Sequence, residues 1–508
     1  MSYLGSKGYT MLKSALSEKQ QEEIKSDLTI KPHVHGSPMN STQPTFPTYR
    51  ESHSKIYMPH YYGVAKFGIP SEVKIPLGTT IHLKFNGDLR ETQRETVSAY
   101  VTHIEKRGGL GGGLIELNCG GGKTVCALNI ISKIQKKTII IVHKEFLMNQ
   151  WIERIHQFLP GTRIGKIQGQ VIDIDNKDIV IGMLQSLSMK EYPASVFESF
   201  GLTIIDEVHH ISSEVFSNCL FKIVTRNMLG LSATMNRKDG TTPVFKMFLG
   251  EVIYKGKREE QHHVEVRAID YSVSDEEFNE TVNDYRGNPQ YSSMITKLCA
   301  YNHRSEFILR VLSDLFEENP EQQVMILAHN KNLLKYLYDA IQHRNIQSCG
   351  YYIGGMKEAK LKETEGKKVV IATYAMAAEA LDIKTLTTLI MATPKTDIEQ
   401  SVGRILREKH SKPIVVDIVD SHGIFQNQWK KRRAFYKKEN YKIIHTTNQK
   451  YREKIWNTVY DPFSSVKTCT KGTDKGTDNG KDAKNDADNE CLQGKCLIKI
   501  KKAPLTSI

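Results

Sequence analysis

The sequence has no uninterrupted apolar stretch that approaches the length of a membrane-spanning helix. Its first twenty residues lack the apolar core after a basic end that marks a secretory signal. The eight cysteines are scattered along the chain and form no CxxC pair, which argues against both a zinc module and a disulfide framework. These absences predict an intracellular protein in a reducing compartment.

Positive charge is what the sequence has in excess. Lys and Arg number 70 against 57 Asp and Glu, which gives a net charge of +13. This excess favours a polyanionic partner, with nucleic acid first and an acidic membrane surface second. The 508 residues are 39% hydrophobic and 25% charged, a composition typical of a globular protein with two to four domains.

An alternation of apolar strands and amphipathic helices begins near residue 88. Strands rich in Ile and Val, with helices between them, predict an α/β fold of two successive parallel-sheet domains. The expected strands cover residues 113–118, 138–142, 178–183, 202–207, 228–233, 324–328, 368–373, 388–392 and 414–419. The polar segment between the two domains holds one further candidate strand, at residues 264–269. The expected helices cover residues 123–134, 145–159, 304–316, 332–344 and 398–406.

Changes in composition divide the chain further. Residues 73–85 alternate apolar and polar residues, which predicts short strands or a hairpin. Residues 471–490 contain no large apolar side chain, which predicts a disordered tail. The expected division is 1–87 for a small N-terminal α+β extension, 88–255 and 301–428 for the two α/β domains, 256–300 for a connector, 429–462 for a basic helical segment and 463–508 for the tail.

The strongest local pattern is LNCGGGKT at residues 117–124, between an expected strand and an expected helix. A phosphate-binding loop requires this context, because glycines turn backbone N–H groups toward phosphate oxygens at a helix N-terminus. Lys123 is expected to contact the β- and γ-phosphates of ATP, and the Thr124 hydroxyl to bind Mg²⁺. Leu117 stands where the pattern usually has its first glycine. The residues expected to line the nucleotide are Asn118, Cys119, Gly120, Gly121, Gly122, Lys123 and Thr124.

Two adjacent acids, Asp206 and Glu207, follow the apolar strand expected at residues 202–207. The carboxyl end of such a strand is where α/β sheets place ligands. Asp206 suits a Mg²⁺-binding role through water, and Glu207 suits activation of the attacking water. Alone, the pair could be a solvated loop; the upstream loop makes the catalytic interpretation stronger.

Three segments resemble motifs II, III and VI of the superfamily 2 helicases. They are DEVH at 206–209, GLSAT at 230–234 and QSVGRILR at 400–407, and they occur in the order that the family has. The resemblance covers residues from about 85 to 420 and implies that both α/β domains are RecA-like. It also implies an ATP hydrolase that uses Mg²⁺ and acts on nucleic acid.

The resemblance assigns roles within the nucleotide site. Gln93 resembles the glutamine that reads adenine, and Ser232, Ala233 and Thr234 resemble the segment that couples hydrolysis to domain movement. Gln400, Arg404 and Arg407 belong to the motif whose arginines reach across the cleft to the γ-phosphate, where a guanidinium stabilises transition-state charge only when the cleft closes. Otherwise the two arginines would be ordinary solvated charges on one helix face.

The resemblance also implies contacts with the nucleic-acid backbone, which carry little sequence information. They are expected at Lys144, Gln185, Ser186, Gly354, Gly355 and Thr373. In the segment 373–382, Ala380 occupies a position where glycine is expected, whereas Asp382 still fits the nucleotide site.

The run from 230 to 250 resembles the branch of XPB-type duplex-opening translocases, phage helicases and viral transcript-release helicases, rather than the DEAD-box RNA helicases. Size and the N-terminal extension most resemble the transcript-release helicases of poxviruses and African swine fever virus. This resemblance implies a monomeric translocase on DNA with 3′-to-5′ polarity, active in viral transcription with transcription machinery as partner, in the host cytoplasm and virion core. Two alternatives stay open: an RNA helicase acting on mRNA, and a scaffold that binds nucleic acid without turning over ATP.

Overall fold

The computed structural model describes residues 2–32, 45–118, 120–210, 214–235, 237, 239–256, 263–379, 383–406 and 412–463. Three residues predicted to act in the nucleotide site, Cys119, Asp382 and Arg407, lie outside this set, as does the tail beyond residue 463 that was predicted to be disordered. The described residues up to Pro462 form one compact unit. None of its helices is long and apolar enough to cross a membrane.

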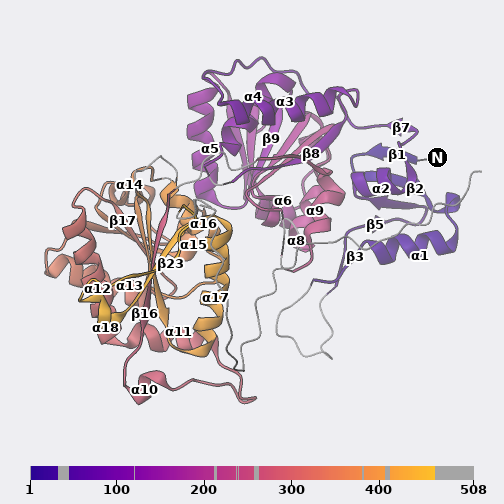
Figure 1. The fold of residues 1–508 in the computed structure, drawn as a ribbon. Coiled ribbons are helices and arrows are strands. Elements are labelled where there is room, and N and C mark those ends of the chain that lie inside the picture. Colours follow the sequence, from indigo (N-terminus) through magenta and orange to yellow (C-terminus); the bar gives the residue numbers. More distant parts are fainter. Residues whose placement is uncertain are drawn as a thin grey trace, which may run out of the picture. The chain divides into compact units, whose positions relative to one another are not determined.

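The N-terminal extension is built on a small mixed sheet with the strand order β5-β6-β2-β1-β7 (Figure 1). Its strands are β1 (Ser2–Gly5), β2 (Gly8–Leu12), β5 (Arg50–Glu51), β6 (Lys55–Met58) and β7 (Glu72–Val73). Leu4, Tyr9, Ile56 and Met58 point to one face of this sheet and are fully buried. They pack in one hydrophobic cluster with residues of α1 (Glu18–Asp27) and α2 (His60–Phe67). A short pair, β3 (Thr29–Ile30) and β4 (Phe46–Pro47), and the 3₁₀ turn η1 (Lys13–Ala15) complete the extension.

The hairpin predicted at residues 73–85 is wrong: only Val73 belongs to a named strand, and Thr80 makes an isolated bridge with Lys136. The alternating apolar residues have another cause, since Ile81 and Leu83 are buried in the core of the next domain. The side chain of Gln135 satisfies the backbone there. Its Oε1 accepts from the Leu83 N–H at 3.0 Å, and its Nε2 donates to the Leu83 carbonyl at 2.9 Å.

The first large sheet has eight strands among the described residues, in the order β11-β10-β12-β9-β13-β14-β8-β15. Within it only β11 runs antiparallel to its described neighbour. The strands are β8 (Gly111–Glu116), β9 (Thr138–Val142), β10 (Ile164–Gln168), β11 (Val171–Ile172), β12 (Ile179–Met183), β13 (Leu202–Ile205), β14 (Asn227–Ser232) and β15 (Val252–Lys255). The five strands predicted for this domain are therefore present, within two residues at each end.

Helices cover both faces of this sheet (Figure 1). One face packs against α3 (Glu91–Glu105), α4 (Lys123–Ile134) and α5 (Glu145–Phe158). The other packs against α6 (Leu184–Met189), α7 (Ser195–Glu198), α8 (Glu214–Leu220), the 3₁₀ turn η2 (Val208–His210) and α9 (Thr242–Leu249). Strands buried from both sides explain the near-continuous Ile and Val runs of the sequence.

The second large sheet also has eight strands in the described part of the chain, in the order β18-β19-β17-β20-β21-β16-β22-β23. Only β23 is antiparallel to its described neighbour. The strands are β16 (Glu265–Tyr271), β17 (Val324–Ala328), β18 (Cys349–Tyr352), β19 (Val369–Thr373), β20 (Thr388–Met391), β21 (Ile414–Asp420), β22 (Lys442–Thr447) and β23 (Asn457–Tyr460). Two tandem parallel-dominated sheets of this kind confirm the predicted RecA-like fold class.

Helices cover the second sheet in the same way. One face carries α10 (Glu276–Asn279), α11 (Tyr291–Ala300), α12 (Asn302–Glu318), α13 (Lys331–His343) and α18 (Asn448–Tyr451). The other carries α14 (Glu358–Glu365), α15 (Tyr374–Glu379), α16 (Glu399–Val402), the 3₁₀ turn η3 (Gly403–Leu406) and α17 (Gly423–Lys438). The helix predicted at 398–406 is thus an α-helical turn that continues as a 3₁₀ turn.

Two acids buried in the apolar strand β21 decide how α12 and α17 dock on this sheet. Arg304 of α12 forms two hydrogen bonds with Asp420, at 2.6 and 2.8 Å. Arg432 of α17 pairs with Asp417 in the same way, at 2.7 and 2.9 Å, and the Tyr436 hydroxyl donates to Asp417 at 3.0 Å. All four charged side chains are buried, so each charge needs its partner.

The basic aromatic patch that the sequence shows at 429–438 is consequently only partly a surface. Trp429, Arg432 and Tyr436 are buried on the sheet side of α17. Lys430, Lys431, Lys437 and Lys438 are exposed on the other side. Arg432 therefore adds no charge to this surface, because its guanidinium is paired with Asp417.

Candidate functional site

The predicted phosphate-binding loop lies at the carboxyl end of β8 and leads into α4. Gly120 and Gly122 have φ values of +82° and +81°, which are strained for any residue with a Cβ. Gly122 caps α4 without a side-chain hydrogen bond to the helix. The first N–H groups of the helix therefore point into the loop, as an anion site requires.

Gln93 lies directly against this loop. A Cβ on Gly122 would be 2.2 Å from Gln93 Nε2, so a larger residue at this position would displace the amide end of Gln93. Gln93 is only 3% exposed, and its Oε1 accepts from the Arg90 N–H at 3.0 Å at the start of α3. The structure thus brings the predicted adenine-reading residue to the phosphate loop and fixes its amide.

Lys123 and Glu207 form an ion pair, with Lys123 Nζ 3.2 Å from Glu207 Oε1. Lys123 comes from the first turn of α4, and Glu207 follows β13. Glu207 has a φ of +50°, a conformation that costs a residue with a side chain about 1–2 kcal/mol. Backbone strain of this size is found most often at functional sites.

Asp206 is held from two sides beneath this pair. The indole Nε1 of Trp151 donates to Asp206 Oδ2 at 3.0 Å, and the Glu207 N–H donates to Oδ1 at 3.0 Å. Burial and the neighbouring Glu207 charge raise the pKa of Asp206 to about 6, against the opposing effect of Lys123. The carboxylate is thus ionised near neutral pH but poorly compensated, as expected of a group that awaits a cation.

His209 connects this acidic pair to the segment after β14. Its Nδ1 lies 3.5 Å from Glu207 Oε2 and 3.2 Å from the Ser232 hydroxyl oxygen. The Ser232 hydroxyl donates to the Thr234 carbonyl at 2.6 Å. Ala233, between them, is buried. The predicted coupling segment is therefore linked by hydrogen bonds and short polar contacts to Glu207.

A pocket of about 750 Å³ opens beside this chain of contacts. Its walls include His209 and Thr234 from the first large sheet and Gln400 from the helix after β20. Further lining residues are Ala233, Arg237, Asp239, Lys395, Thr396, Asp397, Ile398, Glu399, Ser401, Lys431 and Phe435. Arg404, one turn after Gln400, is 6% exposed. The predicted coupling residues Ala233 and Thr234 thus share one cavity with Gln400 of the second sheet, whereas the phosphate loop, Asp206, Glu207 and Arg404 are not among its lining residues and Arg407 lies outside the described residues.

The residues predicted to contact nucleic acid all follow the carboxyl ends of parallel strands. Lys144 follows β9, Gln185 and Ser186 follow β12, Gly354 and Gly355 follow β18, and Thr373 ends β19. In the first sheet, β12 and β9 lie together, whereas the nucleotide residues follow β13, β14 and β8 on the other side. The second sheet repeats this division, with β18 and β19 at one edge and Gln400 after β20.

Contacts at these positions are modest. Burial lowers the pKa of Lys144, and the Ser186 hydroxyl accepts from the Gly169 N–H at 3.0 Å. Gly354 and Gly355 are exposed, as is Gln185. The structure therefore places these residues at the carboxyl ends of parallel strands, where α/β sheets bind ligands. The residues from the first sheet and those from the second sheet do not form one cluster.

Sequence reasoning missed two parts of the site. Trp151 lies at helical spacing in α5, where the pattern indicates only a core residue, and its hydrogen bond to Asp206 has no sequence signal. Arg237 and Asp239 line the pocket and form an ion pair, and the Thr241 N–H and hydroxyl both donate to Asp239. The Arg237 charge lowers the pKa of Asp239 well below its usual range. These two residues stand in the run 230–250 that was read only as a family signature.

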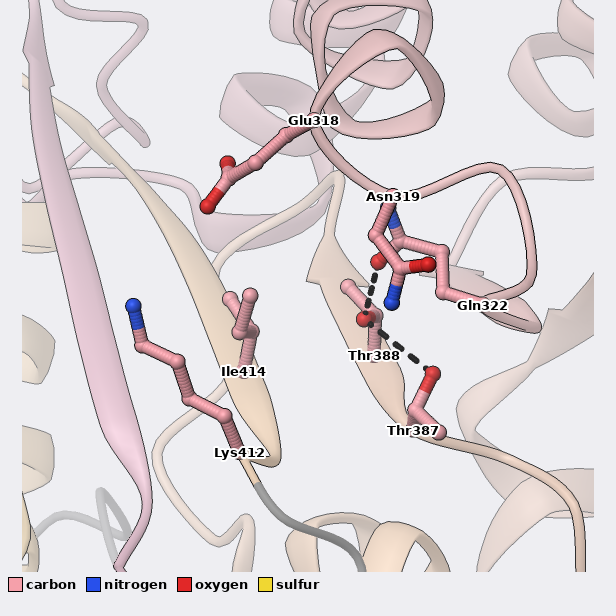
Figure 2. Close-up of a pocket in the computed structure, with 7 residues that line it drawn as sticks. All are labelled: Glu318, Asn319, Gln322, Thr387, Thr388, Lys412 and Ile414. Carbon is pink, nitrogen blue, oxygen red and sulfur yellow. Dashed lines mark hydrogen bonds between the residues drawn. The ribbon is translucent and has the colours of Figure 1, made fainter.

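A second, smaller pocket of about 210 Å³ lies at the opposite edge of the second sheet (Figure 2). Its lining residues lie at or just before the amino ends of β17, β20 and β21. Figure 2 shows the Thr388 hydroxyl between Gln322 and Thr387, with hydrogen bonds of 2.6 and 3.5 Å. Lys412 at its rim is paired with Glu265 at 3.1 Å. Its polar groups satisfy one another, and amino ends of parallel strands are not where α/β sheets place ligands.

Comparisons with known proteins point to one family. The model of the family described as type III restriction enzyme, res subunit, matches residues 86–237. A protein of Acanthamoeba polyphaga mimivirus, provisionally named ATP-dependent RNA helicase L396, is 34% identical over 472 residues, which cover 89% of this chain and 88% of the relative. The African swine fever virus protein provisionally named ATP-dependent RNA helicase QP509L is 27% identical over 390 residues, or 70% of this chain and 74% of the relative.

This chain is therefore related to the African swine fever virus protein and distinct from it. Among solved structures, yeast Dbp5 bound to RNA and ADP BeF3 is similar with a TM-score of 0.48 and 14% identity, over 72% of this chain and 95% of the other. The mimivirus relative matches nearly nine-tenths of both chains and is named a helicase. Helicases are also the proteins whose motifs II, III and VI this sequence resembles. This chain belongs to the superfamily 2 helicases and is an ATP-dependent helicase.

Proposed function

We propose that this helicase uses ATP hydrolysis to move along a nucleic-acid strand, preferably DNA and in the 3′-to-5′ direction. The observation that carries the proposal is the ion pair between Lys123 and Glu207 above the fixed Asp206 carboxylate. The DNA preference and the polarity rest on the resemblance of residues 230–250 to the XPB-type and viral branch. In that branch the task is transcript release or DNA remodelling during viral transcription, in the host cytoplasm and virion core.

The ion pair between Lys123 and Glu207 suggests how Glu207 is kept from acting as a base when no nucleotide is bound. A triphosphate that takes Lys123 as its counter-ion would draw the ammonium away from Glu207, 3.2 Å distant. Glu207 would then be free to accept a proton from an attacking water. Gln93 would position the base, and the glycines of the loop would offer backbone N–H groups to the phosphates.

Mg²⁺ fits the oxygen donors at the site. The Thr124 hydroxyl and the Asp206 carboxylate are hard ligands of the kind that this ion prefers, with Asp206 acting through water. The raised pKa of Asp206 supports this assignment, because a nearby cation would stabilise its charged form. The ion would supply neutralisation of phosphate charge.

Movement would come from the second sheet. Arg404 and Arg407 belong to the segment after β20, and Gln400 of the same segment lines the pocket beside His209. Arginines that stabilise the transition state only when the two domains approach would tie hydrolysis to closure. The Ser232–Thr234 segment, linked to Glu207 through His209, would report the state of the nucleotide. Backbone contacts at Lys144, Gln185, Ser186, Gly354, Gly355 and Thr373 would hold the strand.

The test is ATP hydrolysis with and without single-stranded DNA in Lys123→Ala, with Lys133→Ala as the matched control. Lys133 is an exposed lysine in the last turn of the same helix. We expect Lys123→Ala to abolish the stimulated hydrolysis and Lys133→Ala to retain it. Stimulated hydrolysis in Lys123→Ala would refute the proposed site.

A second candidate function is RNA unwinding, which the printed names of the mimivirus and African swine fever virus relatives favour. Strand displacement with DNA–DNA, RNA–DNA and RNA–RNA duplexes, each with a 3′ or 5′ overhang, separates the candidates. Activity on RNA–RNA alone would favour the second. The third alternative, a scaffold without turnover, is disfavoured because Lys123, Asp206 and Glu207 are all present and in contact.

A further inference from the structure

The N-terminal sheet has an open face whose side chains differ sharply from those of its core face. The register aligns Tyr3 of β1 with Thr10 of β2, and Thr10 with Tyr57 of β6, so these side chains share one face. Both tyrosines are partly exposed, and Thr10 between them is 1% exposed. The neighbouring pair on this face is Gly5 and Gly8, and the Tyr3 ring lies over Gly5, where a Cβ would be 3.1 Å from the ring.

Lysines surround both rings. Lys74 Nζ is 4.8 Å and Lys55 Nζ 5.3 Å from the centroid of Tyr3, and Lys7 Nζ is 5.2 Å from that of Tyr57. Lys55 also donates a hydrogen bond to the Tyr3 hydroxyl at 3.2 Å. The ammonium groups of Lys55 and Lys74 converge on one ring and thus lie within about 10 Å of each other. An anion between them would relieve their repulsion.

One acidic side chain partly offsets the positive charge of these lysines. Glu72, next to Tyr3 in the same row, pairs with Lys74 at 3.0 Å, but both side chains are more than half exposed, so the pair is weak. Arg50, opposite Tyr57, is engaged elsewhere, since it donates to Asn218 and stacks on Phe221. The three lysines therefore leave a net positive surface around two aromatic rings.

We propose that this Tyr3–Tyr57 face of the N-terminal sheet is a second binding surface for single-stranded nucleic acid. Lys55 and Lys74 hold a phosphate, Lys7 holds a neighbouring one, and the rings of Tyr3 and Tyr57 stack on bases. Aromatic side chains flanked by cations on an open surface match the two components of a single strand, whereas an acidic peptide would have no use for the rings. The proposal rests on the proposed function only in taking nucleic acid as the partner.

The experiment measures the affinity of the full chain for a fluorescent single strand at several salt concentrations. For single strands each phosphate contact contributes about 0.7 to the slope of log K against log salt. Because Lys55 and Lys74 share one phosphate, we expect Lys55→Ala with Lys74→Ala to lower that slope by about 0.7. Tyr57→Ala should weaken binding at least about fivefold, the low end for one stacked base, with the slope unchanged, and Tyr57→Phe should restore it.

Lys19→Ala is the matched control, because Lys19 is an exposed lysine on α1 of the same extension. An unchanged slope in the double lysine variant, or wild-type affinity in Tyr57→Ala, overturns the proposal. Failure of the proposed function looks different: the wild-type chain would then show no ATP hydrolysis stimulated by nucleic acid. Failure of this inference alone leaves wild-type stimulation and binding intact and makes the variants indistinguishable from the wild type.

Discussion

Trp151→Phe tests whether the indole N–H of α5 sets the charge state of Asp206. The substitution keeps an aromatic ring at a position that is 2% exposed and removes the donor that lies 3.0 Å from Asp206 Oδ2. A hydrogen bond to a charged group contributes about 1.5–3 kcal/mol. Taking the low end, its loss raises the pKa of Asp206 by about one unit, from about 6 to about 7.

The direction of this pKa change determines the pH values at which the effect should be seen. Mg²⁺ needs the ionised carboxylate, and at pH 6.5 the ionised fraction falls from about three quarters to about one quarter, whereas at pH 8.5 it stays nearly complete. We therefore expect the Mg²⁺ concentration for half-maximal hydrolysis to rise about threefold at pH 6.5 and to be unchanged at pH 8.5. A titration of hydrolysis rate against Mg²⁺ at the two pH values measures this directly.

The control is Trp429→Phe, since Trp429 is a buried tryptophan that packs near Tyr436 on the second sheet. It should leave the Mg²⁺ requirement unchanged at both pH values. Simple loss of packing at Trp151 would lower activity equally at both. An equal loss at pH 6.5 and 8.5, or no change at either, would refute the assignment of the indole to Asp206.

Three further substitutions test other parts of the account. Gly122→Ala should weaken binding of a fluorescent ATP analogue about five- to thirtyfold, since its positive φ costs about 1–2 kcal/mol and its Cβ must displace the amide end of Gln93; added Gln93→Ala removes the close contact but not the strain and should restore binding only in part. Ser232→Ala removes hydrogen bonds of about 1 kcal/mol, so strand displacement per ATP hydrolysed should fall about fivefold while hydrolysis itself persists; equal losses of both would argue against a coupling role. Arg432→Met leaves Asp417 buried without its cation, so denaturant unfolding should show a loss of about 3–5 kcal/mol, and a loss below about 1 kcal/mol would contradict the buried pair.

The large sheets could be predicted because their strands are apolar along their whole length. Thr138–Val142 and Val324–Ala328 are buried from both sides, and such continuous apolar runs indicate strands of a parallel sheet. The loop after β8 and the acids after β13 were found for a related reason. The glycine-rich turn leads into a helix and the paired carboxylates follow a strand, and the carboxyl ends of parallel strands are where α/β sheets bind ligands.

Strands that carry charge were harder to predict. Residues 256–300 read as a polar connector with one candidate strand at 264–269; β16 lies there, but its place between β21 and β22 inside the second sheet was not predicted. Arg267 of β16 is neutralised by Glu265, two residues away in the same strand, and by Glu318 of α12. Glu318 is distant in sequence, so this pairing could not be predicted. Similarly, nothing beside Arg432 in the chain reveals that it points inward; the only signal was Asp417, one of two acids in a strand of Ile and Val, which must have a partner when buried.

The two sheets divide their carboxyl edges in the same way, which gives the proposed mechanism its structural basis. Predicted nucleic-acid residues follow β9, β12, β18 and β19, and predicted nucleotide residues follow β8, β13, β14 and β20. Lys144 begins α5, and Trp151 of the same helix reaches Asp206 two turns later. In the proposed mechanism, a strand bound at Lys144 would be connected to Asp206 through this one helix.

The central claim is that Glu207 activates water once nucleotide has drawn Lys123 away. The most direct measurement is ATP hydrolysis by Glu207→Gln in the presence of single-stranded DNA, together with binding of a fluorescent ATP analogue to the same variant. We predict that the variant binds the analogue at least as tightly as the wild type, because Lys123 loses its competing carboxylate, and that stimulated hydrolysis falls at least about a hundredfold, the low end for a catalytic base. Hydrolysis within a few fold of the wild type would contradict the account.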